Sequence, residues 1–74
     1  MRLKINLNTE SDVYKLVSVA TSVSEDVWLT DSAHNLKVSG KSLLGALYTM
    51  SDWDDIYVEC DRDLYLQLIE LLAD

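Results

Sequence analysis

Few side chains of this 74-residue chain could do covalent chemistry, and they do not group along the sequence. There is one histidine, His34, and one cysteine, Cys60, and neither has a second metal-ligand residue at a suitable spacing. The chain contains no Ser-His-Asp or Cys-His arrangement, no glycine-rich phosphate loop and no zinc spacing. We expect His34 to be a solvated turn residue and Cys60 a small buried apolar residue. These residues favour a protein that is not an enzyme.

Carboxylates are plentiful, but their spacing predicts no metal site. Asp52, Asp54 and Asp55 form a polar turn, and further acids follow at Glu59, Asp61 and Asp63. A calcium loop needs ligands at alternating positions, a glycine and a distal Glu, which this run lacks. The pattern predicts a solvated acidic face, with no metal and no cofactor.

The charge balance narrows the classes of partner. Thirteen acidic residues against six basic ones give a formal net charge of −7. A negative field repels nucleic acid and anionic lipid, and it favours basic partners. The alternative is that the charge only keeps the protein soluble.

The hydrophobic pattern predicts the elements that position these residues. Alternation predicts strands around Leu3–Leu7, Val27–Leu29, Leu36–Val38 and Ile56–Val58. Helical spacing predicts helices over residues 10–22, after an N-cap at Ser42, and after an N-cap at Asp61. The order βαββαβα predicts one α+β domain, residues 1–74, with a four-stranded antiparallel sheet covered on one face by three helices. The open face would carry Lys4, Trp28 and Tyr57.

The sequence also predicts the compartment. The unpaired Cys60 favours a reducing environment. Residues 1–7 alternate polar and apolar types, unlike a signal peptide, and no apolar run approaches the roughly 20 residues that span a bilayer. We expect a cytoplasmic protein without a membrane segment.

Residues 38–47, Val-Ser-Gly-Lys-Ser-Leu-Leu-Gly-Ala-Leu, resemble the HPr phosphocarrier family at the start of its second helix. Residues 20–29 resemble the family's run from helix one into strand two, and the likeness covers nearly the whole chain. The resemblance implies an HPr-like open-faced β-sandwich. It makes Ser42 a candidate regulatory phosphorylation site. It also implies protein partners: phosphotransferase-system components, an HPr kinase or a transcriptional regulator. The candidate contact residues for such partners are Lys41, Leu43, Leu44 and Leu47.

The family's phosphorylated histidine is missing. Aligned on Ala20, the chain places Thr9 at the histidine, Ser11 at the neighbouring arginine and Asp12 at the proline of the family's motif. A phosphothreonine would be too stable to pass its phosphoryl group on, and the arginine's fork of donors is lost. Asp12 also puts negative charge at a helix N-terminus that would otherwise accept an anion. We therefore expect a non-catalytic regulatory or interaction module related to the sugar phosphotransferase system.

Several alternatives remain open at this point. Ser42 could be an N-cap alone. At least one of the three leucines, Leu43, is expected to be exposed on so short a helix, and the alternative is that all three mainly serve the core. The chain could be a genuine phosphocarrier that uses Thr9 or His34. It could also be an acidic scaffold module that binds an unrelated basic partner.

Overall fold

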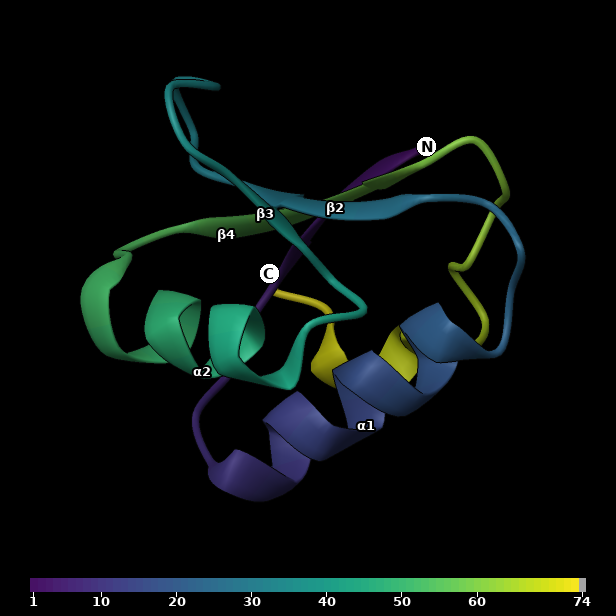
Figure 1. Ribbon diagram of the computed structural model, residues 1–74, viewed down its shortest axis with the longest axis horizontal. Coiled ribbons are helices and arrows are strands. Elements are labelled where there is room, and N and C mark those ends of the chain that lie inside the picture. Colours follow the sequence, from purple (N-terminus) through teal and green to yellow (C-terminus); the bar gives the residue numbers. More distant parts are fainter. Residues whose placement is uncertain (74) are drawn as a thin grey trace.

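Four antiparallel strands form one sheet, and two α-helices pack against one of its faces (Figure 1). The computed structural model describes residues 1–73; Asp74, the last residue of the predicted domain, lies outside the described residues. The elements in chain order are β1 (Arg2–Ile5), α1 (Glu10–Thr21), β2 (Val27–Thr30), β3 (Lys37–Ser39), α2 (Leu43–Asp52), β4 (Ile56–Cys60) and the 3-10 turn η1 (Ile69–Leu71). The α+β class and the four-stranded antiparallel sheet are as predicted.

The sheet has the strand order β1-β4-β2-β3. Its register aligns one apolar residue of each strand in a row across the sheet: Leu3, Val58, Leu29 and Val38. Val58 and Leu29, in the two central strands, are fully buried beneath the helices. Because side chains alternate along a strand, the neighbouring residues lie on the other face, which neither α1 nor α2 covers. Trp28, Tyr57 and Lys4 lie on this open face, as predicted.

Helix α1 begins with a capping box. The Thr9 hydroxyl accepts from the backbone N–H of Asp12, and the Asp12 carboxylate accepts in return from the backbone N–H of Thr9. Val13, Leu16 and Ala20 form its buried stripe. The predicted helix over residues 10–22 is confirmed apart from its last residue. Within residues 1–73, no helix is long and apolar enough to cross a membrane.

The predicted third α-helix is not confirmed. Leu64, Leu68 and Leu71 are buried at helical spacing, but the segment forms turns and the short η1. Its end is drawn into the sheet, because Leu72 pairs with Ile5 of β1. The backbone at Leu72 is extended, so a helix cannot run to the end of the segment as predicted. Two helices and this segment therefore cover the sheet, instead of three helices (Figure 1).

Asp61, the predicted cap of that third helix, does not act as one. The carboxylate that serves the segment's first turn is Asp63, which accepts from the backbone N–H of Tyr65 at 2.9 Å.

Candidate functional site

Ser42 is the N-cap of α2, as predicted. Its backbone is extended, and its hydroxyl accepts from the backbone N–H of Gly45 at 3.1 Å. The hydroxyl thus satisfies one of the donors that a helix leaves free at its first turn. Ser42 is exposed, so the same hydroxyl can be reached from solvent. A phosphate there would face the positive end of the helix dipole.

The leucines after Ser42 divide between solvent and core. Leu44 is 80% exposed and Leu43 is 38% exposed, whereas Leu47 is partly buried against the core. The prediction that at least one of the three, Leu43, would be exposed is confirmed, and Leu44 is more exposed still because it lies on the outer side of α2. Tyr48, one turn after Leu44, is 48% exposed. The N-terminal half of α2 therefore presents apolar side chains to water.

Lys41, the fourth contact residue that the resemblance implies, is tied to its own chain. Its Nζ donates to the backbone carbonyl of Val23 at 2.8 Å, in the loop after α1. This bond anchors the start of α2 to the end of α1. A partner would have to break it to use the ammonium group.

Gly45 lets α2 lie directly on the sheet. A Cβ atom at this position would collide with Cγ1 of Val38 in β3. The missing side chain therefore brings the helix close to the edge strand. This contact fixes which side of α2 faces the core, and so leaves Leu44 facing outward.

The start of α1, where the family would carry its histidine, is already occupied by the chain's own carboxylate. Oδ2 of Asp12 accepts from the backbone N–H groups of Asn8 at 3.0 Å and Thr9 at 3.2 Å. These are donors that an incoming phosphoryl group would need. Thr9 is exposed, but its hydroxyl is committed to the Asp12 backbone.

His34 is exposed in the turn between β2 and β3, as predicted, and its ring also contacts a carboxylate of the sheet. Its backbone lies in the left-handed region at φ 59°, and its Nε2 lies 2.6 Å from Oε2 of Glu59. The same oxygen accepts from the Thr30 hydroxyl at 2.7 Å and from Nε of Arg2 at 2.9 Å. The Thr30 bond, with those from Arg2 and His34, lowers the pKa of Glu59 to about 2.

This four-residue cluster on the open face, Arg2, Thr30, His34 and Glu59, was missed from the sequence. It depends on which strands become neighbours, because β4 lies between β1 and β2. Strand alternation alone does not supply that order. The only signal was that Glu59 falls on the outward side of its strand.

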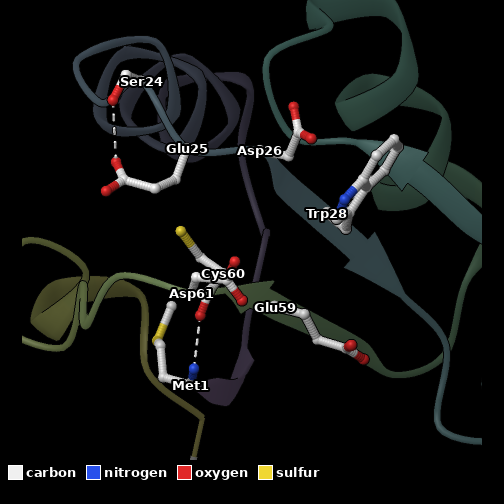
Figure 2. A pocket seen from close by; sticks show the side chains of 8 residues that line it. All are labelled: Met1, Ser24, Glu25, Asp26, Trp28, Glu59, Cys60 and Asp61. Carbon is white, nitrogen blue, oxygen red and sulfur yellow. Dashed lines mark hydrogen bonds between the residues drawn. The ribbon is translucent and has the colours of Figure 1, made fainter.

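A cavity of about 510 Å³ lies at the end of β2 and β4 (Figure 2). Its lining is Met1, Ser24, Glu25, Asp26, Trp28, Glu59, Cys60 and Asp61. Arg62 donates a hydrogen bond to Glu25 and lowers the pKa of that carboxyl group. Since the pKa of Glu59 is lowered too, both carboxylates stay ionised at neutral pH and are poor proton donors. Figure 2 shows them on opposite sides of the cavity.

Cys60 is 6% exposed, in agreement with the predicted small buried residue. Among residues 1–73, no group of three or more His, Cys, Asp and Glu side chains is placed to hold a metal ion. Comparisons with protein-family models, curated proteins and solved structures found no match to this chain.

Proposed function

We propose that this chain is a non-catalytic protein-interaction module of the HPr type, which binds its partners through the N-terminal half of α2. One observation carries the proposal: the exposed apolar residues Leu43 and Leu44 directly follow an exposed N-cap serine. No charged residue occurs in α2 before Asp52, so this surface is uncharged as well as apolar. A partner that covers it removes apolar surface from water.

The HPr-like open-faced β-sandwich is part of this proposal. The resemblance over residues 38–47 supports it, as does the succession of the first six elements, which run β-α-β-β-α-β. The partners that follow from it are phosphotransferase-system proteins, an HPr kinase or a transcriptional regulator, met in the cytoplasm. In this role the chain competes with a true phosphocarrier for shared partners or reports the activity of the kinase.

The capping box of α1 supports the non-catalytic part of the proposal. Thr9 stands where the resemblance expects the phosphorylated histidine, and Asp12 already fills the backbone donors beside it. His34 is held by Glu59 on the open face, which the helices do not cover. Neither residue has the combination of nucleophile and free anion-binding donors that a phosphocarrier needs.

The first test is the intact mass of the protein after incubation with ATP and an HPr serine kinase. We expect one phosphate on the wild type and none on Ser42→Asn. Asparagine is a good N-cap, so this variant removes the phosphorylated hydroxyl without removing the cap. Ser51→Ala, at the other end of α2, is the matched control and should carry the phosphate. An unmodified wild type, or a phosphate on Ser42→Asn, would contradict the proposal.

The second test asks whether the apolar surface is the contact. Leu44→Ser keeps the phosphorylatable serine but removes an 80% exposed apolar side chain, so we expect slower phosphorylation by the same kinase. Leu66→Ser, at a 77% exposed leucine of the C-terminal segment, is the control and should react like the wild type. Equal phosphorylation rates for both variants would show that α2 is not part of the surface that contacts the kinase.

The alternative of a genuine phosphocarrier is tested separately. Incubation with phosphoenolpyruvate and the family's upstream enzyme should leave no acid-labile phosphoryl label. An acid-labile label that disappears in His34→Ala, or an acid-stable phosphate ester that disappears in Thr9→Ala, would support the phosphocarrier and identify its acceptor.

A further inference from the structure

The outer side of α2 carries a ridge of exposed side chains. Leu44, Tyr48 and Asp52 follow one another at intervals of four residues, which makes them neighbours along one side of a helix. All three are exposed. The ridge extends for about 12 Å, at 1.5 Å per residue, and its first two members are apolar.

The ridge leads into a second cavity, of about 260 Å³, between the end of α2 and the β2–β3 hairpin. Its lining is Asp31, Ser32, Leu36, Asp52, Trp53, Asp54 and Asp55. Tyr48 joins the ridge to this cavity, because its ring meets that of Trp53 edge to face with the centroids 6.3 Å apart. Leu36, on the far wall, is 47% exposed. Apolar side chains therefore follow one another from Leu44 through Tyr48 to the Trp53 ring in the wall of the cavity.

The cavity end of the ridge carries negative charge, and only part of that charge is neutralised by ion pairs. Asp55 pairs with Lys4 at 3.3 Å. Asp52 and Asp54, by contrast, have no ion pair within residues 1–73. Both lie at the C-terminal end of α2, where the helix dipole is negative, and the last turn of the helix contains no basic residue. A cation placed here would interact favourably with both carboxylates and with the helix terminus.

We infer that this ridge and cavity are a docking surface for a basic amphipathic helix of a partner protein. The inference rests on the proposed function and names the chemistry of its partner. Apolar side chains of the partner cover Leu44 and Tyr48, and a Lys or Arg at one end of its stripe enters the cavity beside Asp52 and Asp54. The ten-residue α2 is about 15 Å long and matches roughly three turns of a partner helix. The negative end of the ridge disfavours an acidic peptide or an anionic lipid surface.

The probe for this inference is a synthetic, terminally blocked helical peptide of about 14 residues, roughly 21 Å long as a helix. It has a leucine stripe that ends in two lysines, and it contains no tryptophan. The protein has two tryptophans, so the two indole N–H signals in an NMR titration report on the two cavities separately. We expect the Trp53 signal to shift on titration and the Trp28 signal to stay unchanged.

Two pairs of variants separate specific docking from general attraction to an acidic protein. Asp52→Asn with Asp54→Asn should raise Kd by about fivefold. Asp26→Asn with Asp61→Asn removes the same charge at the cavity beside Trp28 and should leave Kd unchanged. Leu44→Ser should raise Kd, whereas Leu66→Ser should not. A peptide with glutamates in place of its lysines should bind at least about fivefold more weakly than the probe.

A shift at Trp28 instead of Trp53, equal effects of the two charge variants, or no binding of the probe would each overturn the inference. These failures are distinct from failure of the proposed function. If the protein is phosphorylated at Ser42 but does not bind the peptide, the assignment as an HPr-type module stands and the partner belongs to another class. A chain that binds the peptide at Trp53 but is never phosphorylated keeps the docking surface and loses the HPr assignment.

Discussion

At the scale of single residues, Glu59 holds the open face of the sheet together. One of its oxygens accepts from side chains of β1, β2 and the hairpin loop: Arg2, Thr30 and His34. The Nη2 group of Arg2 adds a bond to the backbone carbonyl of Asp31. These bonds link the hairpin loop to the sheet, and within that loop His34 adopts a left-handed backbone.

The first prediction concerns the pH dependence of stability. The pKa of Glu59 is about 2 in the folded protein, against an ordinary value of 4.5, so the unfolded state binds more protons between these values. Its stabilisation is complete above about pH 4.5 and is lost as the pH falls towards 2. Urea unfolding between pH 2 and 5 should therefore show a shallower fall of the unfolding free energy in Glu59→Gln than in the wild type. Asp61→Asn, at an exposed acid, is the control, and parallel curves for Glu59→Gln and wild type would contradict the assignment.

At the scale of elements, local signals were readable from the sequence and non-local ones were not. Ser42 was predicted as an N-cap because a cap depends on only the next three residues. The strands followed from alternation and α1 from its apolar stripe. The end of the third predicted helix was missed for a non-local reason: Leu72 pairs with Ile5, at the other end of the domain, and such a pairing leaves no local signature. The exposure of Leu44 could not be predicted from the sequence either, because it depends on how closely α2 packs against Val38 at Gly45.

The second prediction tests that packing. Gly45→Ala should lower the free energy of unfolding by about 1–3 kcal/mol, because the new methyl group collides with Cγ1 of Val38, a stiff β-branched side chain. Chemical denaturation measures the loss. Adding Val38→Ala should recover part of it, since that change removes the colliding atom. A Gly45→Ala protein as stable as the wild type would mean that α2 sits farther from β3 than the structure places it.

At the scale of the whole molecule, the surplus of acid is the dominant electrostatic feature. Within residues 1–73, four of the six basic residues form ion pairs with acids: Arg2, Lys4, Lys15 and Arg62. Lys41 is bonded to a backbone carbonyl, and the Lys37 ammonium lies over the Trp28 ring at 4.2 Å. The acids left over repel one another, which opposes the compact state.

The third prediction follows from this imbalance. Raising NaCl from about 0.02 M to about 0.5 M should increase the urea midpoint at neutral pH, because screening weakens repulsion among the many acids more than it weakens four surface pairs. Asp52→Asn with Asp54→Asn should show a smaller increase. A midpoint that falls with salt would show that the ion pairs outweigh the repulsion.

The strand order also governs when the protein can fold during its synthesis. β1 is synthesised before all the other elements of the domain, but its sheet neighbour is β4, and the Arg2–Glu59 bond spans 57 residues. On the nascent chain β1 therefore has no neighbour until most of the domain has emerged, whereas α1 and the β2–β3 hairpin can form locally. The sheet therefore forms late. Until then β1 remains an unpaired strand, which is prone to aggregation unless it is exposed only briefly or is bound by another protein.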